Sequence, residues 1–272
     1  MLATKKIEEL SAVLQDSVKI INYIKSCALN TRFFKNLRKE MGSDFESLLL
    51  HTDIRWLSRG RALRRLITLK NEVMLFLSGN ASDLVKHFQN KNWLSKLSYL
   101  SDTLDKLNDL NISLQGKNTN ILTSTSKIQA FLKKINVWLM NVKSNSYEMF
   151  PCVEEFITEN ELNFEIIKPI IIKHLVSLGE NLKKYFLPES DMSRFDWIQN
   201  PFYVEVKKVC HLTLKTRKEF TELSSDSSLK TMFAKMSLNS FGVGIKLEYP
   251  NLSRLALLPF ASTYYVKVLF RH

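Results

Sequence analysis

Hydrophobic residues recur every three to four positions along much of the chain, a spacing that predicts amphipathic helices. Residues 5–26 carry the first such pattern and residues 31–41 the second. In the second pattern we expect Phe33, Phe34 and Leu37 to face the core. The cations of this segment are expected on its outer side: Arg32, Lys35, Arg38 and Lys39.

The periodicity changes between residues 48 and 69. Polar and apolar residues roughly alternate over residues 48–57, which is typical of a short strand. Ser58, Arg59 and Gly60 interrupt that alternation. Helical spacing then runs from Arg61 to about Leu77. We therefore expect one strand followed by a helix.

Two long helical patterns occupy the middle of the chain, residues 93–114 and residues 121–142. A tight turn fits residues 116–118 between them, so we expect an antiparallel helical hairpin. Both patterns keep a seven-residue rhythm, so pairing with a partner helix is an alternative to packing within the domain. Shorter helices are predicted further on: residues 169–186, 213–223, 228–236 and 252–258. In the first of these the positions expected to be buried are Ile170 or Ile171, Leu175, Leu178 and Leu182.

Composition agrees with a helical domain and indicates an anionic partner. Only 7 Gly and 6 Pro occur in 272 residues, which disfavours a turn-rich all-β fold. The net charge of +12 and the pI near 9.5 favour nucleic acid over a membrane as partner. No apolar stretch approaches the roughly 18 residues that a membrane span needs. The first residues lack the apolar core of a signal peptide, so we expect a protein that is not secreted.

Most of the candidate chemistry lies in one basic segment. Six cations and no acid occur between residues 55 and 70, among them Arg61, Arg64 and Arg65, which are spaced to share one helix face. Trp56 follows Arg55 at the start of this segment, and such a pair suits stacking on bases and contact with phosphates. A buried Trp56 beside a solvated basic face is the other interpretation.

The segment from His51 to Gly60, with Leu63 and Arg64 after it, resembles the Arg-Trp segment of hAT-family DNA transposases. Three further stretches agree in order and approximate spacing: residues 107–117, 200–202 and 249–252. The resemblance extends over nearly all 272 residues. It is strongest toward host-domesticated relatives that often follow a BED-type zinc finger: BED-type zinc finger protein five, the repeat-containing relatives of transcription factor II-I, and some SCAN-domain proteins.

This resemblance implies a mainly α fold. It would comprise the helical insertion domain of a hAT transposase, with a remnant of a ribonuclease-H-like α/β fold at its two ends. Residues 1–60 would be that remnant and residues 61–250 the helical insertion domain. Residues 251–272 would be a truncated C-terminal hAT segment.

The resemblance also implies that catalysis is lost. hAT transposases use two aspartates and one glutamate to hold two divalent metals. The two aspartates belong to strands expected ahead of this chain, and Asp53 is not one of them. Lys267 stands at the glutamate position, and a cation cannot bind a metal through oxygen. We therefore expect no enzymatic activity, no cofactor, no metal site and no small-molecule substrate.

Binding remains as the expected function. In the family the Trp stacks on a displaced base, so the resemblance makes Trp56 a stacking platform and Arg55 a phosphate or structural contact. Charge and helix phase add further phosphate contacts: Arg59, Arg61, Arg64 and Arg65. A purely structural Trp56, packing the strand against the helix, is the alternative.

The leading hypothesis is a catalytically inactive, transposase-derived protein that binds DNA nonspecifically. We expect it in the nucleus, or otherwise in the cytoplasm. The second hypothesis is a protein-interaction or homodimerisation module that uses the helices of residues 93–142. A third is a vestigial fragment without a selected function.

Overall fold

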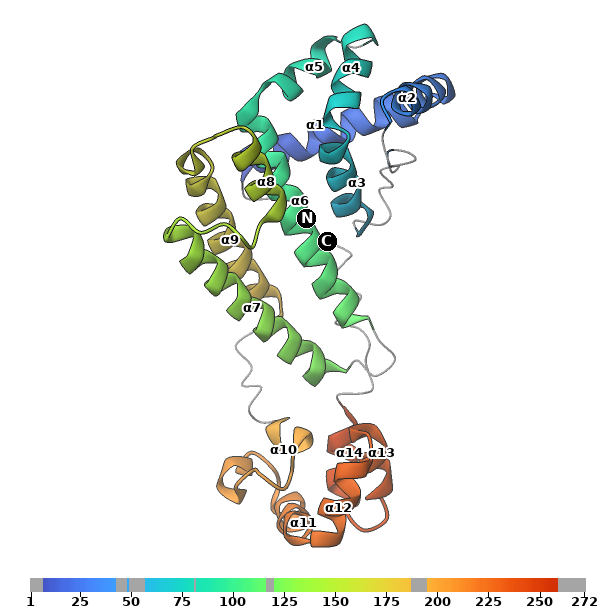
Figure 1. The fold of residues 1–272 in the computed structure, drawn as a ribbon. Coiled ribbons are helices and arrows are strands. Elements are labelled where there is room, and N and C mark those ends of the chain that lie inside the picture. The colour runs from blue at the N-terminus through green and yellow to red at the C-terminus, as the bar shows by residue number, and fades with distance from the viewer. Residues whose placement is uncertain are drawn as a thin grey trace. The chain divides into compact units, whose positions relative to one another are not determined.

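The structure is a computed structural model that describes residues 7–42, 48, 57–80, 82–115, 120–186 and 195–258. The chain forms two compact units, the first from residues 1–113 and 130–183, the second from residues 114–129 and 184–272. Every regular element among the described residues is a helix (Figure 1). The expected predominance of helix is therefore confirmed.

The first unit contains ten helical elements among its described residues. They are α1 (Glu8–Lys25), α2 (Ala28–Glu40), α3 (Leu57–Thr68), α4 (Lys70–Asn80), α5 (Ser82–Gln89), α6 (Lys91–Leu114), the larger part of α7 (Ile121–Lys143), α8 (Pro151–Glu159), the short 3-10 helix η1 (Phe164–Ile166) and α9 (Lys168–Phe186).

Helix α6 has buried residues along most of its length. Tyr99 is fully buried, its hydroxyl lies 2.7 Å from His174 Nδ1 of α9, and its ring packs edge-on against Phe150 just before α8. On the α7 side, the ammonium of Lys106 lies 5.2 Å from the ring centroid of Trp138. Helix α6 therefore contacts α9 through Tyr99 and α7 through Lys106. The two long predicted helices are confirmed with nearly the expected bounds.

Helix α9 shows why amphipathic spacing predicts well where one face is buried. The sequence predicts a helix over residues 169–186, and the observed helix differs by one residue at its start. Each expected core position is buried, with Ile171 rather than Ile170 in the first turn: Ile171, Leu175, Leu178 and Leu182.

Helix α2 corrects two predictions about burial. Phe33, expected inside, is 56% exposed, whereas Arg38, expected outside, is 3% exposed. The buried face instead runs through Phe34 and Arg38, one turn apart. Phe34 packs edge-on against Phe76 of α4, and the Arg38 guanidinium lies over the Phe34 ring. The long apolar stem of arginine allows this arrangement, because it can cover an aromatic ring inside the unit.

Helix α3 begins earlier than predicted. Leu57 is its first residue, so Leu57 is not extended and residues 58–60 do not interrupt the helix. A break does occur at Leu69, between α3 and α4, although Leu69 still donates its N–H to Arg65 O and accepts that of Val73. Residues 49–56 of the expected strand lie outside the described residues.

The second unit contains the first turns of α7 and six further elements. These are α10 (Asp196–Gln199), the 3-10 helix η3 (Val206–Val209), α11 (Leu214–Ser225), α12 (Ser227–Lys235), α13 (Leu238–Gly244) and α14 (Pro250–Leu257). The helices expected at residues 213–223, 228–236 and 252–258 are thus confirmed as α11, α12 and α14.

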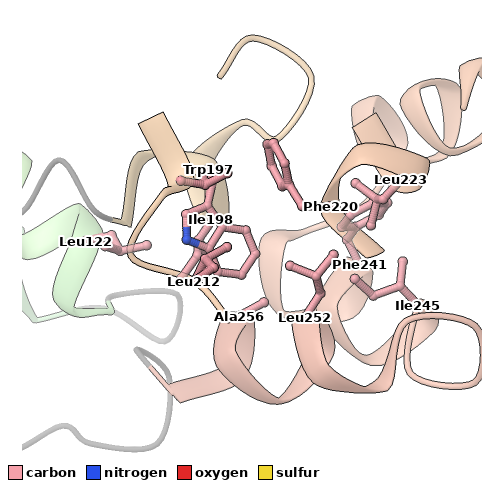
Figure 2. Close-up of a cluster of buried hydrophobic side chains, with 11 residues drawn as sticks. Leu122, Trp197, Ile198, Leu212, Phe220, Leu223, Phe241, Ile245, Leu252 and Ala256 are labelled. Carbon is pink, nitrogen blue, oxygen red and sulfur yellow. The ribbon is translucent and has the colours of Figure 1, made fainter. Parts of the chain in front are cut away.

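Apolar side chains from most of these helices form the core of the second unit (Figure 2). Helices α11 and α14 are also joined by one carboxylate. Glu219 accepts the backbone N–H of Leu252 at 2.9 Å and a hydrogen bond from the Asn251 side chain, so it caps the N-terminus of α14. Helices α13 and α14 approach closely at Gly242, whose carbonyl oxygen accepts the buried Ser253 hydroxyl at 2.7 Å.

The predicted division at residues 60 and 250 concerns ancestry and stays a prediction. Residue 60 lies inside α3 and residue 250 begins α14. Among the described residues, no helix has both the length and the hydrophobicity to cross a membrane.

Candidate nucleic-acid interface

Three of the six predicted contact residues can be placed, and all three lie on α3. Arg55 and Trp56 lie outside the described residues, as does the side chain of Arg59. Lys267, the predicted lost catalytic position, is also outside them. The geometry of the candidate interface therefore comes from Arg61, Arg64 and Arg65.

The three arginines follow the solvent side of α3. Arg61 and Arg64 are exposed and Arg65 is half-buried. The opposite side packs into the first unit through Ala62, Leu63 and Leu66, each at most 1% exposed. Spacings of three and four residues place side chains on one helix face, so the guanidinium groups share one side of α3.

Helix α3 lies unusually close to α6 at Gly60. A Cβ atom at this position would come within 3.2 Å of the carbonyl carbon of Leu104 and 2.8 Å of Asp105 Oδ1. Only a glycine lets the two backbones approach this closely without displacing a neighbour. Gly60 is therefore a packing residue of a continuous helix.

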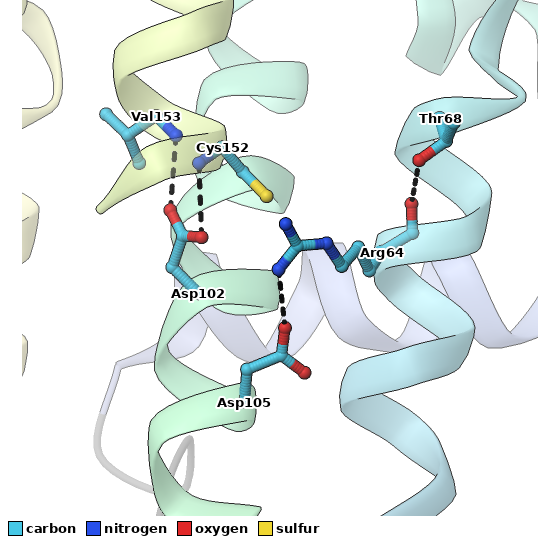
Figure 3. Close-up of polar contacts among 6 residues, drawn as sticks. All are labelled: Arg64, Thr68, Asp102, Asp105, Cys152 and Val153. Carbon is cyan, nitrogen blue, oxygen red and sulfur yellow. Dashed lines mark hydrogen bonds and ion pairs between the residues drawn. The ribbon is translucent and has the colours of Figure 1, made fainter. Parts of the chain in front are cut away.

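Arg64 forms an ion pair across this helix contact. Its Nη1 lies 3.1 Å from Asp105 Oδ2, with the Arg64 side chain 54% exposed and that of Asp105 27% exposed (Figure 3). The hydrogen bond to Asp105 raises the pKa of Arg64, and the nearby Cys152 and Asp102 act in the same direction, against a smaller effect of burial. Such a solvated pair contributes only about 0–1 kcal/mol to stability, so Asp105 is a weak competitor for this guanidinium.

A second carboxylate, one turn earlier on α6, has a structural role. Asp102 is 2% exposed and accepts the backbone N–H groups of Cys152 and Val153, each at 3.1 Å. It thus caps the N-terminus of α8, where backbone N–H groups otherwise lack partners. Burial raises the pKa of Asp102, and its hydrogen bonds to the α8 backbone only partly oppose that shift.

The Cys152 thiol, which lies beside this cap, is unsuited to nucleophilic chemistry. Burial raises its pKa to about 12, and the neighbouring Asp102 adds to the effect. The thiolate is the reactive form of cysteine, so this thiol is inert near neutral pH. The part of the chain that the structure describes also has no group of three or more His, Cys, Asp or Glu side chains that could hold a metal.

Lys70 fixes the start of α4 near the arginines. Its ammonium lies 2.9 Å from Glu159 Oε2 at the end of α8 and 5.5 Å from the ring centroid of Phe156. Together with the Arg64–Asp105 pair, this contact links α3 and α4 to α6 and α8.

Sequence reasoning missed the two aspartates that organise this region. Asp102 and Asp105 interrupt the otherwise apolar and small-polar stripe of α6 at a three-residue spacing. That interruption is the one local signal of a contact with another helix. It does not identify the partners, because Arg64 and Cys152 are 41 and 50 residues away along the chain.

Comparison with known proteins places the chain in a family. Residues 1–143 match the FAM200-GTF2IRD2-like family, described as the FAM200/GTF2IRD2 helical domain. The chain belongs to this family. The match covers more than half of the chain and includes all of α1–α6 and α7, and hence the whole candidate interface.

A relative that matches nearly the whole chain agrees with the FAM200/GTF2IRD2-like assignment. General transcription factor II-I repeat domain-containing protein 2 from Bos taurus is 29% identical over 265 residues, covering 96% of this chain and 27% of the relative. The chain therefore spans about a quarter of the length of that curated relative. No solved structure matches. The expected similarity to repeat-containing relatives of transcription factor II-I is confirmed, and it supports a transposase-derived origin.

Proposed function

We propose that this FAM200/GTF2IRD2-like protein binds DNA without cleaving it, and that α3 contacts the phosphate backbone. The observation that carries the proposal is the shared solvent side of Arg61, Arg64 and Arg65 on a helix without an acidic residue. Arginine guanidinium groups are well matched to phosphate, and contacts of this kind dominate nonspecific DNA affinity. The ion pair between Arg64 and Asp105 is exposed to solvent and weak, so a phosphate can replace Asp105.

The proposal includes the finer features that the hAT resemblance implies. Residues 1–60 and 251–272 would descend from a ribonuclease-H-like domain and residues 61–250 from its helical insertion. Trp56, Arg55 and Arg59 would extend the basic surface of α3, with Trp56 stacking on an unpaired base. Lys267 in place of a metal-binding glutamate would remove two-metal catalysis.

A nuclear location belongs to the same proposal. The name of the bovine relative refers to a general transcription factor, a class of protein that works on chromosomal DNA. The net charge of +12 also favours a polyanionic partner.

The test is a salt titration of DNA binding by the full chain. Fluorescence anisotropy with a labelled hairpin DNA is recorded at several salt concentrations, for the wild type and for the triple variant Arg61→Gln, Arg64→Gln, Arg65→Gln. Each lost phosphate contact should reduce the slope of log affinity against log salt by about 0.9. The triple variant should therefore bind more weakly and with a slope lower by about 2 to 3.

A matched control removes the same charge from another surface. Lys133, Lys134 and Lys143 are exposed on α7, and their triple change to Gln should leave most of the slope in place. Equal effects of the two triple variants would mean that net charge, not α3, determines binding. An unchanged slope in the arginine variant would refute α3 as the interface.

A second candidate function, a protein-interaction module, is favoured by exposed apolar residues on the two long helices. Ile112 of α6 is 58% exposed, and Val137 and Met140 of α7 are 52% and 68% exposed. Val137 and Met140 are three residues apart, as on a helix face that meets another helix. Self-association that persists at high salt in analytical ultracentrifugation, and that Met140→Lys abolishes, would support this function over DNA binding.

A further inference from the structure

The second unit holds an exposed aromatic side chain whose position is set by a short turn. Asn200 Oδ1 accepts the backbone N–H of Phe202 at 3.2 Å, and Asn200 O accepts that of Tyr203 at 3.4 Å. Phe202 packs edge-on against Phe233 of α12, with ring centroids 5.6 Å apart. The adjacent Tyr203 is 79% exposed, so the turn anchors one ring in the unit and presents the next to solvent.

One cation lies against the Tyr203 ring, and two more follow it closely in the sequence. The ammonium of Lys230 on α12 lies 5.4 Å from the centroid of the Tyr203 ring, within the range of a cation–π contact. Lys207 and Lys208 follow on η3, and both are exposed. Residues 206–218 and 227–247 contain no acidic residue. The two segments, which contain Lys208 and Lys230, therefore carry cations and no acid.

Two acids close in sequence to these lysines, Glu205 and Asp226, already have partners. Glu205 forms an ion pair with Lys207, which leaves Lys208 as the unneutralised cation of η3. Asp226 accepts the backbone N–H groups of Ser228 and Leu229 at 2.7 and 3.1 Å, as the N-cap of α12. Hydrogen bonding to the α12 backbone lowers the pKa of Asp226. The negative charge of Asp226 thus interacts with the N-terminus of α12 rather than with Lys230.

We infer that Tyr203, with Lys208 and Lys230, is a stacking platform for an unpaired base of a single-stranded nucleic acid. An exposed ring offers a π-face on which any base can stack, and adjacent cations neutralise the flanking phosphates. At 79% exposure most of the ring area is open even with Lys230 over it. A polyacidic protein segment would use the lysines, but it would gain little from a bare aromatic face.

This inference goes beyond the proposed function of α3. It assigns a second stacking site for an unpaired base, Tyr203, to a compact unit separate from the one that contains α3. A protein with both surfaces would bind DNA that contains duplex and single-stranded parts more tightly than either part alone, through effective concentration.

The experiment measures binding of labelled oligothymidylate to the full chain by fluorescence anisotropy. Tyr203→Ala should weaken binding about tenfold, since stacking on an aromatic residue contributes measurably per base. Tyr203→Phe keeps the ring and should bind within about twofold of the wild type. Joint change of Lys208 and Lys230 to Gln should lower the salt slope by about 1.4, at about 0.7 per contact on a single strand.

The control is Leu247→Ala, which removes a 96% exposed apolar side chain from the same unit and should leave binding unchanged. Circular dichroism confirms that each variant is folded. Wild-type affinity retained by Tyr203→Ala would overturn the inference, as would equal loss of duplex and oligothymidylate binding in that variant. Failure of the wild type to bind oligothymidylate would overturn it as well, whatever the α3 arginines do on duplex. Displacement by polyglutamate that is insensitive to Tyr203→Ala would indicate a protein ligand and would also overturn it.

Discussion

Two helical glycines of the first unit should respond in opposite directions to the same substitution. Gly60 lies in α3 against α6, where an added Cβ would come within 2.8 Å of Asp105 Oδ1 and 3.2 Å of the Leu104 carbonyl carbon. Gly79 lies in α4, where an added Cβ would meet nothing within 4 Å. Replacing each with Ala separates the close helix approach from the intrinsic preference for helix.

The magnitude follows from two competing effects. In a helix interior Ala is favoured over Gly by about 1 kcal/mol, a gain that both variants share in principle. At Gly60 the contact with backbone atoms of α6 cannot be relieved by rotating a side chain, so the helices must separate. Overpacking of this kind costs about 1–3 kcal/mol. We expect Gly79→Ala to stabilise the unit by about 0.5–1 kcal/mol and Gly60→Ala to destabilise it by up to about 2 kcal/mol.

Urea unfolding followed by far-ultraviolet circular dichroism measures both changes in the free energy of unfolding. The double variant Gly60→Ala, Asp105→Ala removes the 2.8 Å contact but keeps the backbone contact, so it should recover only part of the loss. Gly60→Ala that is as stable as Gly79→Ala would refute the close approach of α3 to α6. The arginines of α3 would then lack the fixed support that the proposed interface needs.

Three further predictions concern the α6 carboxylates. Asp102→Ala should lower the free energy of unfolding by about 2–4 kcal/mol, since two buried N–H groups lose their acceptor. Asn90→Ala, which removes an exposed cap with the same number of N–H partners, should cost about 1 kcal/mol in the same urea experiment. Burial raises the pKa of Asp102 above its ordinary value of 3.8, so the folded state binds this proton more tightly than the unfolded chain does. Its contribution to stability is thus present in acid and is lost as pH rises through the folded pKa, and Asp102→Asn should remove this pH dependence from unfolding curves. Asp105→Asn should raise DNA affinity by freeing Arg64, and anisotropy that shows weaker binding would contradict that expectation.

Helix-level predictions succeeded where one face of a helix is buried along its whole length. The spacing of α9 predicted its bounds and its core residues because hydrophobic burial dominates that face, although His174 is buried there as well. Helix α2 departed from its pattern because the Arg38 guanidinium packs over the Phe34 ring, which places a charged residue on the buried side. A pattern of apolar and polar residues treats every arginine as exposed, so it cannot predict a long side chain whose apolar part is buried.

The residues of the candidate interface could be predicted from the sequence, but the contact that holds α3 against α6 could not. The helix phase of Arg61, Arg64 and Arg65 could be read locally, and the structure places them on one side of α3. The role of Gly60 could not be predicted from the sequence. Glycine is typical both of a break in a helix and of a close contact between two helices, and only the tertiary structure distinguishes these cases. Gly60 was therefore interpreted as part of a break, although it lies inside the helix.

The correction at Gly60 changes what the basic segment can do. A break at residues 58–60 would leave the arginines on a helix whose start has to be ordered when DNA binds, at a cost in conformational entropy. A continuous helix fixed to α6 holds their backbone in place before binding, so only side-chain freedom remains to be lost. Arg64 already gives up part of that freedom to Asp105, in a solvated pair weak enough for a phosphate to replace. Close packing at Gly60 and weak pairing at Arg64 thus favour the same outcome, a pre-organised basic surface on which Arg64 can exchange Asp105 for a phosphate.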